Sequence, residues 1–233
     1  MSIRYEDGLV RRIPFRDVRL ADFAGSIPWR TFRSVHGQEH YSGSYASATT
    51  GGHVVYESRL ELARLLLADF DGGVCGIFAQ PCLVVARVGG RVRRHVPDFL
   101  LAQGTGTVQV VNVKPADRLE DPKIVEALAW PGELVEGHGW RYEIWSGADP
   151  VLLENVRFLA AYRRAGVVPE VEVARAWSSV CDGDSLGVAE RRLAGGLPRY
   201  AARPPLMALL WSGRLATDLS RPLAGGSVLR RTA

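Results

Sequence analysis

The chain has 233 residues, of which 47% are hydrophobic and 23% charged, and its formal net charge is +4. This composition excludes wholesale disorder, which needs few apolar residues and a high net charge. No stretch reaches the roughly 18 uninterrupted apolar residues that would span a bilayer, and the N-terminus has no apolar core of a secretory signal, so we expect no membrane partner and a cytoplasmic location. The mild positive charge is compatible with a nucleic-acid partner.

The first 50 residues are expected to form an irregular basic N-terminal arm, because they contain few periodic runs and end in a stretch rich in Gly, Ser and Thr. From residue 54 the pattern changes. Apolar residues then recur at helical spacing up to Phe70, and Asp71-Gly72-Gly73 ends this predicted helix.

Three apolar or alternating runs follow, separated by glycine turns, at residues 82–88, 91–102 and 107–114. This pattern predicts a meander of antiparallel strands. A second helix is expected to begin at Pro122 and to bend at Pro131.

A further strand over 140–146 and a third amphipathic helix over 149–166 complete the pattern. Residues 51–165 are therefore expected to form an α/β domain, a mixed sheet flanked by helices. Residues 166–233 are expected to form a separate, small domain, because two or three short helices precede a basic, hairpin-like end. Short helices followed by a ribbon predict a winged-helix-like module.

The strongest chemical signal is Asp98, followed on the next predicted strand by Asn112-Val113-Lys114. Side chains two apart on a strand share a face, so Asn112 and Lys114 point the same way, and pairing of neighbouring strands can bring Asp98 beside them. Carboxylate and amide oxygens suit a hard divalent cation such as Mg²⁺. Only two of the 29 positive residues are lysines, Lys114 and Lys123, and a lysine can orient or help to deprotonate a water where an arginine cannot.

Plainer interpretations compete with this one. Asp98 could cap a turn after Pro97, and Lys114 could be a solvated strand end. Arg91, Arg93 and Arg94 either contact DNA phosphates near the reacting bond or belong to an ordinary solvated hairpin.

The segment from 36 to 40 matches the H-x-x-E-H pattern of inverted zinc peptidases. The glycine inside it and the loop-like residues after it argue against the helix that such a zinc site needs.

The stretch from Ile27 to about Arg164 resembles the TnsA endonuclease subunit of heteromeric transposons, a branch of the PD-(D/E)XK, restriction-endonuclease-like nucleases. The motifs that carry the resemblance occur in the same order as in that family: PWRTF, GGHVVYESRLELARLLLADFDGGVCGIFAQP, HVPDFLL, VVNVKPADRLEDPKI and DPVLLENVRFL. The tail LMALLWSGRLATDLSRPL looks like that family's small C-terminal domain.

This resemblance implies a helix carboxylate at Glu61, a strand aspartate at Asp98 and a Gln-x-Lys motif at Asn112-Val113-Lys114. Glu61, Asp98 and Lys114 would then be catalytic, and Glu61, Asp98 and Asn112 would hold the metal. Glu57, one turn before Glu61, is an alternative carboxylate. Ser58-x-x-Glu61 is also a capping-box pattern, in which the glutamate only serves the start of the helix. Asn112 departs from the family because its side chain is one methylene shorter than glutamine.

The activity implied is that of a Mg²⁺-dependent DNA endonuclease, in which Mn²⁺ substitutes and Lys114 positions the attacking water. In the resembled family this subunit cuts the 5′ strand at the element's ends. Its partners there are double-stranded DNA, a DDE-type transposase subunit and an ATPase regulator. Two alternatives remain open: a stand-alone defence or repair nuclease, and a non-catalytic DNA-binding or assembly subunit with a decayed site.

Overall fold

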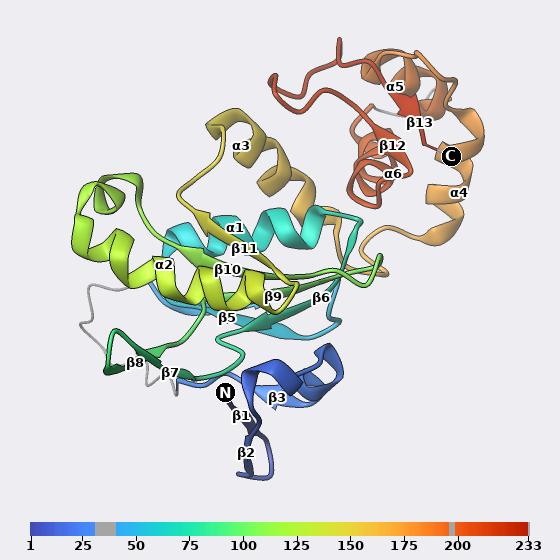
Figure 1. The fold of residues 1–233 in the computed structure, drawn as a ribbon. Helices are drawn as coiled ribbons and strands as arrows, with labels where there is room; N and C mark the ends of the chain where they lie inside the picture. Colours follow the sequence, from blue (N-terminus) through green and yellow to red (C-terminus); the bar gives the residue numbers. More distant parts are fainter. Residues whose placement is uncertain (31–40, 196–198, 233) are drawn as a thin grey trace. The chain divides into compact units, whose positions relative to one another are not determined.

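The structure is a computed structural model that describes residues 1–30, 41–195 and 199–232 (Figure 1). The chain divides into two compact units, Met1–Gly147 and Ala148–Ala233. In the described ranges it combines several small β-sheets with six α-helices, which confirms the predicted α/β class. No helix in these ranges is both long and apolar enough to span a bilayer.

A mixed four-stranded sheet with the strand order β11-β10-β9-β6 forms the centre of the first unit. Its strands are β6 (Val74–Ala79), β9 (Phe99–Gln103), β10 (Val108–Val113) and β11 (Arg141–Trp145). β9 pairs antiparallel with both β6 and β10, whereas β10 and β11 are parallel. A parallel pair needs a long crossover, and α2 (Pro122–Gly137) supplies it. The sequence analysis had missed β6.

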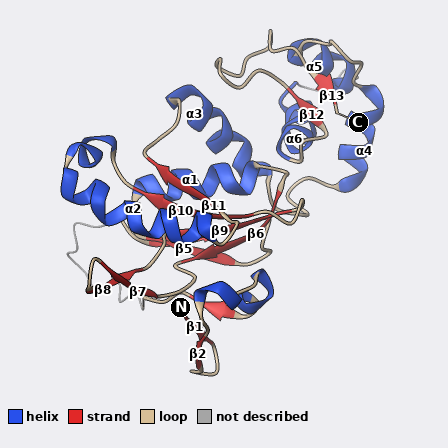
Figure 2. Ribbon diagram, in the orientation of Figure 1, coloured by secondary structure: helices blue, strands red, loops and turns tan. Residues whose placement is uncertain are grey.

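Helices lie against this sheet (Figure 2). α1 (Arg59–Phe70) begins at the predicted Ser58 cap, and its Arg64 bonds to Glu143 of β11 through the guanidinium Nη2 at 2.8 Å. Tyr142, the residue before Glu143 on β11, donates a hydrogen bond from its hydroxyl to the main chain of α2. Because adjacent strand residues point to opposite faces, α1 and α2 cover opposite faces of the sheet. α2 continues through Pro131 to Gly137.

The predicted meander is wrong in one respect. The run 91–102 is not one strand, because it is interrupted at Pro97-Asp98. The part before the break, β8 (Arg91–His95), pairs only with β7 (Val84–Val88) as a separate two-stranded ribbon. The part after the break is β9 of the central sheet. Proline has no N–H to give to a ladder, which accounts for the break at this point.

The N-terminal residues differ from the irregular arm that we expected. Residues 1–30 contain a three-stranded antiparallel sheet of β1 (Ser2–Tyr5), β2 (Val10–Arg12) and β3 (Ser26–Ile27), with two short 3₁₀ helices, η1 (Phe15–Asp17) and η2 (Leu20–Phe23). Ile3, Val18 and Phe23 are fully buried in a core cluster with Leu100 of β9 and Trp130 of α2. This segment is therefore part of the domain. Beyond the gap, β4 (Gly43–Ala46) and β5 (His53–Tyr56) form a hairpin.

The second unit begins with α3 (Pro150–Leu159) and η4 (Ala160–Tyr162). It continues with α4 (Glu170–Ser179), α5 (Leu186–Ala194) and α6 (Arg199–Trp211), and then with a two-stranded ribbon of β12 (Leu215–Ala216) and β13 (Arg230–Arg231). Three short helices followed by a ribbon agree with the expected secondary structure of the tail.

The division between the units lies earlier than the boundary expected at 165/166, because α3 packs with the second unit. The buried Asn155 on α3 gives a reason. Its amide nitrogen donates to the carbonyls of Leu219 and Arg221 at 2.9 and 2.8 Å, and its amide oxygen accepts from the N–H of Leu223 at 3.1 Å. The loop between β12 and β13 is therefore held by α3. The periodicity of the sequence carries no information about such a polar contact.

Candidate active site

A cavity of about 380 Å³ lies where the end of β10 meets the starts of β9, α1 and α2. It gathers Glu61, Asp98, Asn112 and Lys114, together with the alternative carboxylate Glu57. These residues come from three separate segments of the sequence. The cavity is also lined by His95 and by three further cations, Arg30, Arg94 and Lys123, so with Lys114 four cationic side chains surround three carboxylates.

Asp98 is fixed by the sheet although it precedes β9. Its main-chain N–H donates to the carbonyl of Val111 at 3.1 Å, and its carbonyl accepts from the N–H of Gln80 at 2.8 Å. Its carboxylate Oδ2 accepts from the N–H of Val113 at 2.7 Å. Asp98 is therefore held beside the residue that separates Asn112 from Lys114, as the expected strand pairing required.

Glu61 occupies the first turn of α1 and also lines the cavity. Ser58 caps the helix, its Oγ accepting from the N–H of Glu61 at 3.0 Å. The carboxylate of Glu61 accepts from the N–H of Glu57 at 2.8 Å and from the Ser58 hydroxyl at 3.0 Å. The capping interpretation therefore describes a real contact. A carboxylate has about four lone-pair positions, so these two bonds leave others for a ligand in the cavity.

Glu61 and Asp98 are both buried, and the pKa of each is raised above its ordinary value. Burial raises the pKa of Glu61, a hydrogen bond from the N–H of Glu57 opposes it, and the nearby charge of Asp98 raises it further. Burial also raises the pKa of Asp98, against the hydrogen bond from Val113 and the positive charge of Lys114. Removing a carboxylate from water disfavours its ionised form, and a second carboxylate nearby disfavours it again. Perturbed acids that share a cavity are typical of functional sites.

The position of Arg30 at the cavity depends on its contact with Gln80. Gln80 is buried and has a φ of +45°, a left-handed backbone that is rare outside glycine. Its carbonyl accepts from the N–H of Trp29 at 2.9 Å. Its side-chain oxygen accepts from the N–H of Arg30 at 3.3 Å. The Arg30 guanidinium pairs with Glu57 at 2.9 Å. Gln80 thus holds both Asp98 and Arg30 at the end of β6. These contacts offset the strain of its left-handed backbone.

The side chain of Asn112 does not face open space. Its amide nitrogen donates to the Tyr142 hydroxyl at 2.8 Å, and its amide oxygen lies 2.8 Å from Nε2 of His95. The oxygen that we expected on the metal is therefore already engaged in a hydrogen bond. A metal role for this side chain stays a prediction that requires these contacts to rearrange.

The donor groups of the cavity are of the kind that a magnesium ion requires. Glu61 and Asp98 supply hard carboxylate oxygens, and a divalent cation would offset the repulsion between them that raises the pKa of Glu61. In the described ranges no three His, Cys, Asp or Glu side chains gather in a metal-binding cluster. Mg²⁺ commonly takes only one or two carboxylates and completes its shell with waters and substrate phosphates. The residues present fit such an ion.

The sequence analysis had not assigned Arg30, His95, Lys123 or Tyr142 to the site. Lys123 is the second of the two lysines, which was an available signal. Arg30 gave no such signal, because its position at the cavity depends on contacts with the distant residues Gln80 and Glu57. Tyr142 belongs to a strand whose parallel pairing with β10 the sequence did not reveal.

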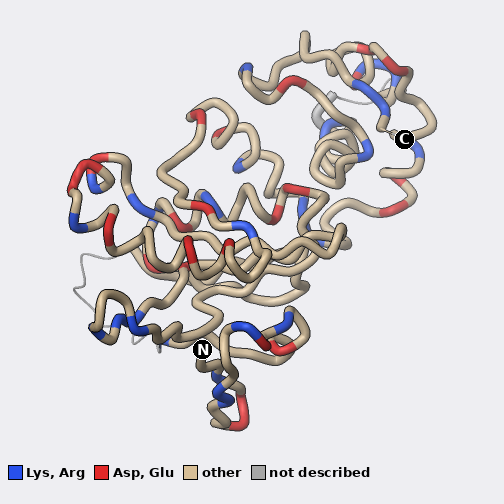
Figure 3. The backbone as a smooth tube through the Cα atoms, viewed as in Figure 1, with Lys and Arg blue, Asp and Glu red and all other residues tan. Residues whose placement is uncertain are grey.

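The three arginines expected on DNA have different surroundings. Arg91, Arg93 and Arg94 lie on β8, in the basic β7–β8 ribbon (Figure 3). Only Arg94 lines the cavity. The Arg93 guanidinium pairs with Glu126 of α2 at 2.5 Å. An exposed pair of this kind contributes little stability, so a phosphate can replace the glutamate at small cost.

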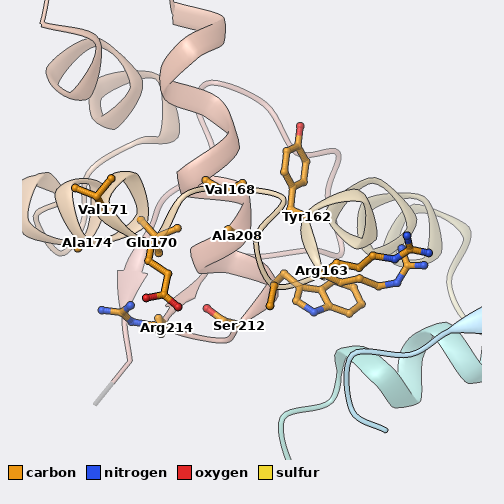
Figure 4. A pocket seen from close by; sticks show the side chains of 14 residues that line it. Tyr162, Arg163, Val168, Glu170, Val171, Ala174, Ala208, Ser212 and Arg214 are labelled. Atoms are coloured by element: carbon orange, nitrogen blue, oxygen red, sulfur yellow. The ribbon is translucent and has the colours of Figure 1, made fainter. Parts of the chain in front are cut away.

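A larger cavity of about 650 Å³ lies inside the second unit, between the segment after η4 and helices α4 and α6 (Figure 4). Apolar side chains such as Val168 and Ala208 line it together with Arg163 and Arg214. Among its described lining residues Glu170 is the one acid, so these residues do not include a pair of buried carboxylates like that of the first cavity. The H-x-x-E-H segment at 36–40 lies outside the described residues.

No protein-family model matches this chain. A search of curated proteins likewise finds no match.

Proposed function

We propose that this protein is a metal-dependent DNA endonuclease that hydrolyses phosphodiester bonds. One observation carries the proposal. Glu61, Asp98 and Lys114, which the sequence analysis selected from three separate segments, line a single cavity. Two carboxylates, a lysine and further cations are the set that hydrolysis of a phosphodiester needs.

The carboxylates of Glu61 and Asp98 would hold one or two Mg²⁺ ions, with Mn²⁺ as a substitute. A bound divalent ion would stabilise the charge that develops on the phosphate oxygens. The rigid main-chain contacts of Asp98 support this role, because a metal ligand must keep its position when the substrate arrives.

Lys114 follows the last residue of β10, and its N–H donates to the carbonyl of Trp145 at 2.9 Å. This bond extends the parallel pairing with β11 by one residue and fixes the start of the lysine side chain. In the described ranges no ion pair engages its ammonium group. We assign it to orienting the attacking water, while Arg30 and Lys123 neutralise the phosphate.

We assign the basic β7–β8 ribbon to binding the phosphate backbone of DNA. Arg94 would contact the phosphate at the cavity, and Arg91 and Arg93 would contact its neighbours on the same strand of DNA. Such contacts position the duplex and carry no base information. Affinity should therefore fall steeply with salt concentration.

We further assign the core of the first unit to the restriction-endonuclease-like fold and the second unit to a winged-helix-like fold. Three helices followed by a ribbon support the second assignment. The guanidinium carbons of Arg214 and Arg231 lie 4.6 and 3.8 Å from the ring centre of Trp177. This basic, partly exposed cluster suits either DNA or an acidic protein surface.

As the biological setting we propose cutting of the 5′ strand at transposon ends, with a DDE-type transposase and an ATPase regulator as partners, in the cytoplasm. A stand-alone defence or repair nuclease would use the same site. The engagement of the Asn112 amide favours a second candidate, a DNA-binding or assembly subunit without catalysis, because that side chain is not free for a metal.

Cleavage of supercoiled plasmid with Mg²⁺ or Mn²⁺ tests the proposal. The protein is assayed alone and with any transposase encoded beside it. Metal-dependent nicking supports the nuclease. Binding of DNA with no nicking in any combination, and with no metal binding by calorimetry, supports the non-catalytic subunit.

A further inference from the structure

A chain of three hydrogen bonds runs from helix α2 to the wall of the cavity. The Tyr142 hydroxyl donates to the carbonyl of Leu128 at 2.8 Å. The Asn112 amide nitrogen donates to that hydroxyl at 2.8 Å. The Asn112 amide oxygen lies 2.8 Å from Nε2 of His95, a residue that lines the cavity.

The direction of every bond in this chain follows from its fixed end. A main-chain carbonyl can only accept, so Tyr142 uses its single proton on Leu128 and must accept from Asn112. The nitrogen of the Asn112 amide therefore faces the tyrosine, and its oxygen faces the histidine. An amide oxygen can only accept, so Nε2 of His95 carries the proton. In the neutral ring the lone pair is then on Nδ1.

Close packing on both sides of Asn112 holds Tyr142 and His95 in this arrangement. Position 132 is a glycine, and a Cβ built there would lie 2.9 Å from the Tyr142 ring. The ring can approach α2 closely only because that atom is absent. On the other side the imidazole of His95 packs edge-to-face on Trp130, with ring centres 6.0 Å apart. The Asn112 side chain between them is 1% exposed.

We propose that His95 is a positioning residue of this site, whose Nδ1, kept as a hydrogen-bond acceptor by the Leu128–Tyr142–Asn112 chain, orients the water that attacks the phosphodiester. This inference rests on the proposed nuclease function and adds a residue to it. No proton is transferred to His95 in this role.

Of the two reactants, only the water can donate a hydrogen bond to Nδ1. The cations Arg30, Lys114 and Lys123 offer donors and have no acceptor. The oxygens of a phosphodiester are acceptors, which suit those cations and do not suit a lone pair. Water is the one reactant that brings protons. In the described ranges no protein group is hydrogen-bonded to Nδ1, so the acceptor is available.

Two substitutions separate the two ring nitrogens. In His95→Asn, the amide group is attached at the position of Nδ1 and can present an oxygen there, but the contact with Asn112 is lost. In His95→Gln, the amide nitrogen reaches the position of Nε2 and can still donate to Asn112, but no acceptor remains near Nδ1. His53→Gln, an exposed histidine on β5 outside the cavity, is the matched control.

Turnover and KM for plasmid nicking are measured for the four proteins. We expect His95→Gln to lose roughly tenfold or more in turnover with little change in KM, and His95→Asn to keep most of the activity, since the interaction matters in the reaction rather than in DNA binding. A purely structural role for the Asn112 contact gives the opposite order, and that order overturns the inference. Equal activity of wild type and His95→Gln also overturns it.

Long-range ¹H–¹⁵N correlation spectra of the imidazoles give a readout that needs no cleavage. We expect His95 of the wild type in the Nε2–H form, and a mixture of the two tautomers in Tyr142→Phe, which lacks the hydroxyl. An Nδ1–H form in the wild type overturns the inference while the nuclease function stands. A wild type that cuts no DNA under any condition removes the proposed function and this role together.

Discussion

The carboxylate of Asp98 accepts a hydrogen bond from the main-chain N–H of Val113 at 2.7 Å, across two neighbouring strands. Val113 lies between Asn112 and Lys114, so this one contact sets the position of the aspartate relative to the lysine. The bond uses Oδ2 of Asp98, and in the described ranges no hydrogen bond engages Oδ1. One oxygen of the carboxylate is thus structural and the other is free for chemistry.

This division predicts different outcomes for two substitutions of Asp98. In Asp98→Asn the amide oxygen can still accept from Val113, and the buried charge is gone, so we expect stability equal to or above that of the wild type. In Asp98→Ala the buried N–H of Val113 loses its acceptor, which costs roughly 1–3 kcal/mol. Urea unfolding of both variants measures the difference. An asparagine variant less stable than the alanine variant would contradict the assignment of the two oxygens.

The raised pKa of Asp98 predicts how this difference depends on pH. The folded state binds a proton at Asp98 more readily than the unfolded state does, so ionisation of this group opposes folding. The penalty is fully present above the folded-state pKa and disappears as the pH falls to the ordinary value near 4. Glu57 contributes to the raised value, while Lys114 and Arg30 oppose it.

We therefore expect the stability gained in Asp98→Asn to be largest near pH 8 and to shrink towards pH 4. Thermal unfolding of the variant and the wild type across this range gives the measurement, and taking the difference removes the titration of groups that do not interact with Asp98. A gain that grows as the pH falls would show that the charged form of Asp98 is favoured in the fold.

A second buried aspartate, Asp69, provides a contrast outside the site. Its carboxylate accepts from the hydroxyls of Tyr45 and Ser47 and from the N–H groups of Ala48 and Thr49, at 2.6–3.0 Å. Burial by itself would raise the pKa of Asp69, but these bonds outweigh it and hold the pKa below its ordinary value. Here the charged form is favoured in the folded state.

Asp69→Asn should therefore destabilise the protein by about 2–3 kcal/mol at pH 7, because an amide cannot accept all four bonds. The contribution of the carboxylate is present above the unfolded-state pKa and is lost as the pH falls through the lower folded-state value. Urea unfolding at pH 7 and at pH 3 checks both statements. DNA cleavage by the variant at low temperature should match that of the wild type, since Asp69 does not line the cavity.

The three hydrogen bonds of Asn155 predict where the chain can be cut into folded parts. A fragment of residues 148–233 keeps these bonds between α3 and the loop from Leu219 to Leu223 and should unfold cooperatively. A fragment of residues 166–233 lacks α3 and should be clearly less stable. Circular dichroism during heating distinguishes them. Equal melting of both fragments would place the boundary at 165/166 as the sequence predicts.

Local signals in the sequence predicted the start of α1 and the strands β10 and β11, because caps, glycine turns and short periodic runs act over a few residues. The expected pairing of strands grouped Asp98, Asn112 and Lys114, and the resemblance to a nuclease family added Glu61; all four line one cavity. What the sequence missed depends on distant contacts.

The positions of Arg30 and Tyr142 illustrate such contacts. Arg30 is directed by Gln80, whose left-handed backbone no propensity predicts at a non-glycine residue. Tyr142 meets Asn112 because β11 runs parallel to β10 after the crossover through α2. Because of this pairing the Asn112 amide is hydrogen-bonded to Tyr142, whereas we had expected this side chain to contact a metal.

The most direct test of the account is the rate of plasmid nicking with Mg²⁺ by four proteins: the wild type, Asp98→Asn, Lys114→Arg and Asp117→Asn. Asp117 is an exposed acid on η3 outside the cavity and serves as the matched control. The account predicts nicking by the wild type and the control, with losses of about 100-fold or more in the other two, because the charge of an arginine does not replace the donor geometry of Lys114. Undiminished nicking by Asp98→Asn, at a stability equal to that of the wild type, would contradict the claim that this cavity is the active site.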